Sequence, residues 1–101
     1  MSYRLRVSPR AEAQIRVAAD WWLENRPKAP EAFAEEIARA FDLIRALPSV
    51  GEPVAHPSLK GVRRVLLWKV RYYLYYQPFP AAEIVEVLAL WHTSRGKGPR
   101  F

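Results

Sequence analysis

The chain has 101 residues, of which 50% are hydrophobic and 13% aromatic, so we expect one packed domain spanning residues 1–101 rather than two. It contains no cysteine, which excludes a disulfide framework, a thiolate zinc site and a cysteine nucleophile. Its net charge of +6 favours an acidic protein or a nucleic acid as the partner or target.

The first two predicted elements are a strand and a helix. Residues 3–7 alternate apolar and charged side chains with a period of two, which is typical of a strand with one buried face. Ser8 and Pro9 then provide an N-cap and a first-turn proline, and apolar residues recur at helical spacing until residues 25–27 break the pattern. The sequence therefore predicts a strand followed at once by a helix.

A second helix is predicted between Pro30 and Pro48. Its apolar residues recur at intervals of four, three, four and three, as one face of a helix requires: Phe33, Ile37, Ala40, Ile44 and Leu47. Only a few residues separate the two helices, so we expect an antiparallel hairpin whose apolar side covers a sheet.

The rest of the chain predicts that sheet. Residues 49–60 contain proline and glycine and indicate an extended connection, and three apolar, aromatic and β-branched runs typical of strands follow, at residues 62–68, 71–77 and 83–91. Residues 69–70 and 78–82 are the expected turns, the second unsuited to strand pairing because it holds two prolines. The predicted fold class is α+β, in the order β-α-α-β-β-β, with a helical hairpin packed on a mainly antiparallel four-stranded sheet. Residues 96–101 are expected to form a flexible tail.

The sequence gives no sign of a membrane protein. The first twenty residues hold four arginines and no apolar run suited to a signal peptide, and no later segment reaches the length of a membrane span. We therefore expect a cytoplasmic protein with no membrane partner.

The excess of positive charge gathers in the second half of the chain. The first fifty residues hold eight basic and seven acidic side chains, whereas the remainder holds eight basic and three acidic ones. A solvated basic face is one interpretation; the other is a surface that binds phosphates or an acidic target through Arg63, Arg64, Lys69, Arg71, Arg95 and Lys97. Since neighbouring residues in a strand point to opposite faces, only one of Arg63 and Arg64 is expected to share a surface with Arg95 or His92.

Aromatic residues accompany these cations. Guanidinium groups beside aromatic rings suit a single-stranded nucleic acid, because they hold phosphates while the rings stack on bases. Packing in the core or between strands is the alternative for the same rings, which belong to Trp68, Tyr72, Tyr73, Tyr75, Tyr76 and Trp91.

His92 is the candidate for proton transfer, because it closes the last predicted strand three residues before Arg95. Imidazole titrates in the range that this chemistry needs, but a polar residue that merely ends a strand is the alternative. Neither His92 nor His56 lies in a metal-ligand spacing, so no metal and no cofactor are expected.

Six short motifs follow one another over nearly the whole chain. They are Ser-Pro-Arg-Ala at 8–11, Pro-Glu-Ala-Phe at 30–33, Pro-Ser-Val-Gly-Glu-Pro at 48–53, Gly-Val-Arg-Arg at 61–64, Tyr-Tyr-Leu-Tyr-Tyr at 72–76 and His-Thr-Ser-Arg at 92–95. In this order and spacing the motifs resemble the RelE/ParE superfamily of toxins from bacterial type II toxin–antitoxin modules. The resemblance implies the predicted fold and a toxin that a cognate antitoxin holds inactive.

The resemblance leaves the target of the toxin open, because members of the superfamily share a fold and differ in action. RelE-like members cut messenger RNA on the ribosome, and such a nuclease would use Arg64 and Arg95 at the phosphate with His92 moving protons. ParE-like members instead block DNA gyrase. Val54 and Thr93 stand where some nucleases have a Glu and a Tyr, so the sequence favours a ParE-like, plasmid-stabilisation type of toxin without enzyme activity. A ribosome-dependent endoribonuclease and a non-toxic antitoxin-binding domain are the alternatives.

The resemblance also implies a small antitoxin encoded next to the toxin. Because the chain is basic, we expect the toxin-binding segment of this antitoxin to be acidic and to fold onto the toxin. The expected binding surface is the helical hairpin or a nearby sheet edge, through Trp21, Trp22, Arg63, Arg64 and Arg95.

Overall fold

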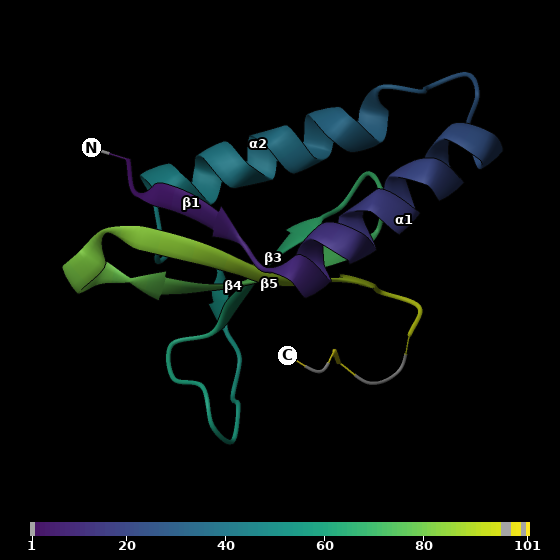
Figure 1. Cartoon of the computed structure of the whole chain (residues 1–101). Coiled ribbons are helices and arrows are strands. Elements are labelled where there is room, and N and C mark those ends of the chain that lie inside the picture. Colours follow the sequence, from purple (N-terminus) through teal and green to yellow (C-terminus); the bar gives the residue numbers. More distant parts are fainter. Residues whose placement is uncertain (1, 96–97, 100) are drawn as a thin grey trace.

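The computed structural model describes residues 2–95, 98, 99 and 101, and shows two helices on one side of a five-stranded sheet (Figure 1). The helices are α1 (Pro9–Asn25) and α2 (Ala32–Ala46). The strands are β1 (Arg4–Val7), β2 (Glu52–Pro53), β3 (Arg63–Leu67), β4 (Tyr72–Phe79) and β5 (Ile84–His92), and η1 (Pro80–Ala82) is a short 3-10 helix. The sheet order is β1-β5-β4-β3-β2, with β1 parallel to β5 and the other pairs antiparallel. The predicted α+β class and element order are confirmed.

Local hydrogen bonds fix both ends of the helical hairpin. The Oγ of Ser8 accepts from the backbone N–H of Ala11 at 3.1 Å, so the predicted N-cap of α1 is confirmed. At the other end, the indole Nε1 of Trp22 donates to the carbonyl oxygen of Ala29 at 2.7 Å, which ties α1 to the turn before α2. The helix α2 begins at Ala32, two residues later than the proline that signalled its start.

The sheet differs from the sequence prediction in two strands. Four strands were predicted, and the additional one is β2, which pairs only two residues with β3. A strand this short has no alternating pattern that could be detected in the extended connection. Pro78, expected in a turn, lies inside β4 opposite Val85. A proline is tolerated there because β3 pairs with β4 only as far as Tyr76, and no strand among the described residues pairs with that side of β4 beyond it.

The two faces of the sheet are covered differently. The face below the helices holds the larger core cluster, in which Ile44, Leu74 and Val85 are fully buried. The opposite face, which we call the helix-free face, holds a smaller cluster of buried residues: Val62, Tyr75, Leu88 and Ala89. A register shift in the β4–β5 pairing after Tyr75 lets Val87 face the helices while Leu88 and Ala89 both face away.

The C-terminal residue covers part of the helix-free face. The ring of Phe101 stacks on His56 with 5.1 Å between centroids and lies 5.6 Å from the ring of Tyr75. Residues 96, 97 and 100, which belong to the tail expected from the sequence, lie outside the described residues.

The hydroxyl of Tyr76 links the sheet to the connection after α2. It donates to the carbonyl oxygen of Pro48 and accepts from the N–H of Gly51, both at 2.8 Å, and the tyrosine is fully buried. A Cβ at Gly51 would lie 2.7 Å from this hydroxyl, so the close approach requires glycine. Burial raises the pKa of Tyr76, which favours the neutral hydroxyl that makes both bonds. The contribution of this hydroxyl to the stability of the fold is lost only as the pH rises through the elevated pKa.

We expect Tyr76→Phe to lower the free energy of unfolding by about 1–3 kcal/mol, because it leaves the buried N–H of Gly51 and the partly buried carbonyl oxygen of Pro48 without their partner. Urea denaturation followed by circular dichroism measures this change. A loss below about half a kcal/mol would show that water replaces the hydroxyl at no cost.

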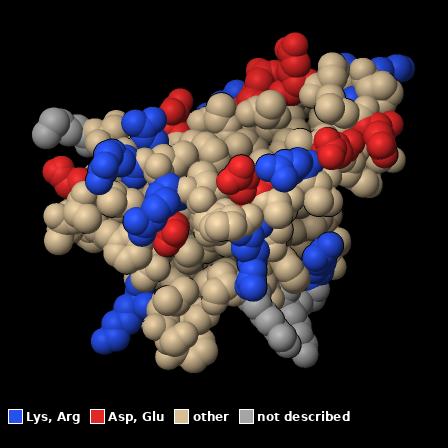
Figure 2. Space-filling view, viewed as in Figure 1, with Lys and Arg blue, Asp and Glu red and all other residues tan. Residues whose placement is uncertain are grey.

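The acidic side chains are unevenly distributed over the surface. In Figure 2 the acidic groups gather mainly over the helices, whereas the part of the surface below them exposes chiefly basic groups. This matches the sequence, in which only three of the ten acidic residues follow residue 50. Among the described residues, no helix is both long and apolar enough to cross a membrane.

Candidate target-binding face and groove

A row of two cations and two aromatic rings crosses the helix-free face; we call it the cation–aromatic row. Tyr73 and Trp91 are direct partners across β4 and β5. The guanidinium carbon of Arg64 lies 4.0 Å from the centre of the Tyr73 ring, and that of Arg95 lies 4.8 Å from the centre of the Trp91 ring. Contacts of this kind hold a guanidinium group over a ring and restrict its motion. The row therefore presents two arginines in fixed positions on one surface.

Arg64 is further oriented by two polar partners. Its Nε forms an ion pair with the carboxylate of Glu52, and its Nη1 donates to the hydroxyl of Tyr75 at 3.3 Å. The hydrogen bond with Tyr75 and the charge of Glu52 raise the pKa of Arg64. Arg64 thus lies on the surface that also carries Arg95. The sequence predicted that only one of Arg63 and Arg64 would share this surface, and the structure identifies Arg64.

Arg63 has a different environment. Its Nη1 donates to the carbonyl oxygens of Ser49, at 3.2 Å, and Gly51, at 2.7 Å. These bonds hold the connection after α2 against the start of β3. Because both acceptors are backbone groups of the same chain, the geometry indicates a structural contribution for Arg63.

The turn between β3 and β4 places more basic side chains near the end of β5. The N–H of Thr93 donates to the carbonyl oxygen of Arg71 at 2.9 Å, so this turn lies beside the residues that follow β5. Trp68 is 68% exposed, and the ammonium group of Lys69 lies 5.8 Å from the centre of its ring. The structure therefore brings Lys69 and Arg71 to the same end of the sheet as Arg95. Lys97 lies outside the described residues.

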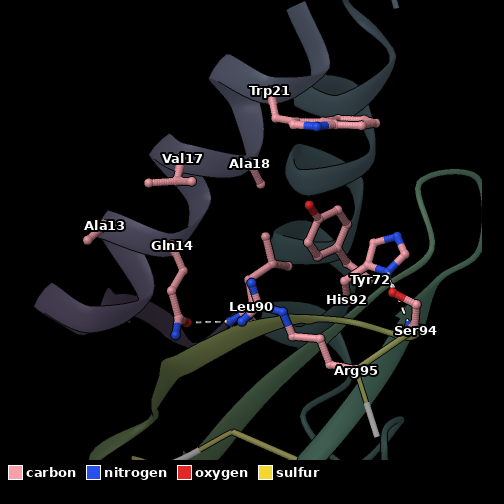
Figure 3. Close-up of a pocket in the computed structure, with 10 residues that line it drawn as sticks. All are labelled: Ala13, Gln14, Val17, Ala18, Trp21, Tyr72, Leu90, His92, Ser94 and Arg95. Atoms are coloured by element: carbon pink, nitrogen blue, oxygen red, sulfur yellow. Dashed lines mark hydrogen bonds between the residues drawn. The ribbon is translucent and has the colours of Figure 1, made fainter. Parts of the chain in front are cut away.

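A groove runs between α1 and the end of β5 on the helix side of the sheet; we call it the α1–β5 groove (Figure 3). Its volume is about 520 Å³, and ten residues line it: Ala13, Gln14, Val17, Ala18, Trp21, Tyr72, Leu90, His92, Ser94 and Arg95. Val17 and Trp21 are 70% and 48% exposed, although both are large and hydrophobic. Among the residues that the structure describes, Arg95 is the one charged residue that lines the groove. The groove therefore combines an apolar wall with a cationic end.

Arg95 and Tyr72 meet at this cationic end. Burial raises the pKa of Tyr72, and the positive charge of Arg95 opposes this shift. The raised pKa favours the neutral hydroxyl, which can both donate and accept hydrogen bonds in the groove. Since Arg95 also lies over Trp91 in the cation–aromatic row, its side chain borders both surfaces.

His92 lies in the groove and is held by its own turn. Its Nδ1 lies 2.7 Å from the Oγ of Ser94 and accepts from the N–H of Ser94 at 3.1 Å. The ring also packs edge-on against Tyr72, with 5.0 Å between centroids. Because Nδ1 accepts a backbone hydrogen bond, the proton of the neutral ring lies on Nε2.

The three residues expected to form a nuclease site do not converge. His92 faces α1 in the groove, whereas Arg64 lies over Tyr73 on the helix-free face. Arg95 alone borders both surfaces. Among the described residues, no group of three His, Cys, Asp or Glu side chains is placed to hold a metal ion.

The residues expected to bind an antitoxin fall on separate surfaces. Trp21 lines the groove, whereas Trp22 packs against the larger core and donates its hydrogen bond to the turn between the helices. Sequence reasoning missed Val17 and Gln14. A signal was present, because Ala13, Val17 and Trp21 recur every four residues along one line of α1, beside the line that faces the core.

A comparison of the sequence with protein families gives one match over most of the chain. Residues 5–96 match the family described as the ParE toxin of the type II toxin–antitoxin system parDE. No curated protein sequence shows significant similarity to the chain.

Solved structures of toxin–antitoxin proteins share the fold. A structure of the chromosomal ParDE system from P. aeruginosa superposes with a TM-score of 0.71 at 13% identity, covering 92% of this chain and 98% of that one. The RelBE2 toxin–antitoxin complex from Mycobacterium tuberculosis superposes with a TM-score of 0.65 at 20% identity, covering 91% of this chain and 99% of that one. The archaeal RelE–RelB complex from Pyrococcus horikoshii superposes with a TM-score of 0.63 at 15% identity, covering 95% of this chain and 100% of that one. At these identities the likeness shows a common fold and leaves the target open.

Proposed function

Because the chain belongs to the ParE toxin family of type II toxin–antitoxin systems, we propose that it arrests growth by binding DNA gyrase and that it cuts no nucleic acid. The match to this family over residues 5–96 is the observation that carries the proposal. A gyrase target places the toxin in the cytoplasm. The proposed target-binding surface is the cation–aromatic row together with the basic turn between β3 and β4.

The geometry supports binding rather than cleavage. A ribonuclease needs a proton-transfer group and a cation at one phosphate, but His92 and Arg64 lie on opposite faces of the sheet. The carboxylate of Glu52 forms an ion pair with Arg64, so this acid is already engaged with a cation. Rings and guanidinium groups held in place suit a protein interface, because little conformational freedom is lost when the partner binds.

We propose a cognate acidic antitoxin as the second partner. The ParDE and RelBE structures that share this fold are named as toxin–antitoxin systems, and the positive charge of this chain would speed association with an acidic segment. Association should slow as salt is added, because exposed charges are screened beyond about 10 Å at 0.1 M ionic strength.

Purified protein is expected to inhibit DNA supercoiling by gyrase and to leave messenger RNA intact on translating ribosomes. The direct measurement compares supercoiling of a relaxed plasmid with primer-extension mapping of message in a translation reaction. Cleavage products in the translation reaction, together with unimpaired supercoiling, would replace the gyrase proposal by the ribonuclease alternative.

A further inference from the structure

The ring of Phe101 fills an aromatic site on the helix-free face; we call it the His56–Tyr75 site. The Phe101 ring stacks on that of His56 with 19° between the planes, and it lies tilted by 47° against the ring of Tyr75. It also packs against the smaller cluster of buried residues beneath it. A Cβ at Gly98 would lie 3.7 Å from the hydroxyl of Tyr75, so the chain passes close to the site a second time.

Hydrogen bonds of their own hold the two walls of this site. The Nδ1 of His56 accepts from the N–H of Ser58 at 3.1 Å and from that of Leu59 at 2.9 Å. Tyr75 is 3% exposed, and its hydroxyl accepts from the Nη1 of Arg64 at 3.3 Å. None of these bonds involves Phe101. Both walls therefore keep their positions when the ring leaves, and a site that is formed in advance costs a ligand little free energy of ordering.

Phe101 itself is held by fewer interactions than the walls. Its contacts are made by the ring, which stays partly exposed. Among the described residues, neither Gly98 nor Pro99 nor Phe101 makes a backbone hydrogen bond to the sheet. Another aromatic side chain could make the same ring contacts, so its exchange for Phe101 breaks no backbone hydrogen bond among these residues.

Arg64 defines the chemistry next to the site. Its Nε pairs with the carboxylate of Glu52 and its Nη1 donates to Tyr75, which leaves further N–H groups of the planar guanidinium for another acceptor. A carboxylate suits them, because it can accept two of these bonds at once. A ligand that fits would therefore carry an aromatic ring with a carboxylate close to it.

We propose that the His56–Tyr75 site anchors the target: Phe101 closes it in the free protein, and an aromatic side chain of gyrase that lies next to a carboxylate replaces Phe101 in the complex. The proposal rests on the proposed function, because it names the chemistry by which the target is held. Tyr75 connects the site to the cation–aromatic row through its hydrogen bond with Arg64. Phe101 is thus a competitor of the target on the surface that we assign to it.

The first experiment tests the site without gyrase and uses N-acetylphenylalanine, which carries both a ring and a carboxylate. Added to the Phe101→Ala variant, it is expected to shift the ring-proton NMR signals of His56 and Tyr75. Its affinity for this variant should be at least about threefold higher than for the wild type, because only the open fraction of the wild-type site can bind. N-acetylalanine, which lacks the ring, is the control and should leave these signals in place. Unshifted signals with N-acetylphenylalanine overturn the site.

The second experiment measures the inhibition of gyrase supercoiling by variants. Phe101→Ala is expected to inhibit at least about threefold more strongly than the wild type, because the competitor is gone. His56→Asn should inhibit at least about tenfold more weakly, since Asn removes the stacking ring but keeps an oxygen that can accept from the N–H groups of Ser58 and Leu59. Phe79→Ala is the matched control, because Phe79 is also a partly buried phenylalanine but contacts Arg6. It should change inhibition less than about twofold.

The two experiments separate the proposals. Inhibition by Phe101→Ala that is equal to or weaker than that of the wild type overturns the exchange, and full inhibition by His56→Asn overturns the anchor; both results leave the gyrase proposal standing. Failure of the wild-type protein to inhibit gyrase overturns the proposed function and the assignment of the site to the target. The binding of N-acetylphenylalanine does not depend on that result.

Discussion

Phe33→Ala is expected to lower the free energy of unfolding by about 3–5 kcal/mol. Phe33 is 3% exposed, and its ring packs edge-on against Tyr72 with 5.9 Å between centroids. The residue therefore joins α2 to the sheet at the end where β4 begins. Truncation removes the buried ring and leaves a cavity that the two rigid elements cannot close.

A loss of this size is a large fraction of the total stability of a small domain, which is about 5–15 kcal/mol. Thermal unfolding and urea denaturation should both report it, with a melting temperature lower by more than about 10 °C. Leu43→Ala is the matched control, because Leu43 lies on the same helix and is 39% exposed. Equal losses for the two variants would contradict the packing of α2 described above.

The helices and the long strands could be predicted because each carries a periodic pattern. Ser8 and Pro9 marked the start of α1, and apolar spacing placed Phe33 and Ile37 on the buried side of α2, where the structure confirms them. The short strand β2 and the passage of β4 through Pro78 could not be predicted. The two features depend on which strand lies beside the segment in the folded sheet, and the sequence of the segment alone does not contain that information.

The candidate site was harder to predict than the fold. The alternation of a strand correctly implied that Arg63 and Arg64 diverge, but the choice between them depends on the register of β3, β4 and β5. That register places Tyr73 opposite Trp91 and so aligns Arg64 with Arg95. The groove depends on where β1 stops relative to β5, which is a property of the assembled sheet.

Arg95 borders two surfaces, the cation–aromatic row that we propose as target-binding and the α1–β5 groove. Its guanidinium group lies over Trp91 on one side and lines the groove on the other. A variant of Arg95 therefore changes both surfaces at once. Arg64 does not line the groove, so it tests the target-binding surface alone.

Arg64→Gln is expected to weaken the inhibition of gyrase by at least about tenfold, which corresponds to about 1.4 kcal/mol of binding free energy. The substitution removes the cation from the Tyr73 ring and from the hydroxyl of Tyr75. Arg6→Gln is the matched control. Arg6 likewise pairs with a carboxylate, that of Glu86, and lies 5.7 Å from the centre of the Phe79 ring, at a distance from the cation–aromatic row along the sheet.

Both substitutions remove a partly exposed ion pair, so their effects on the free energy of unfolding should be similar and below about 1 kcal/mol. Their effects on growth should differ: cells producing the Arg6→Gln variant should arrest like those with the wild-type protein, whereas cells producing Arg64→Gln should survive. Equal toxicity of the two variants at equal expression would remove Arg64 from the target-binding surface. Retained binding of the Arg64→Gln variant to the antitoxin would show that its fold is intact. Loss of gyrase inhibition together with retained antitoxin binding is thus the result that assigns Arg64 and the helix-free face to the target.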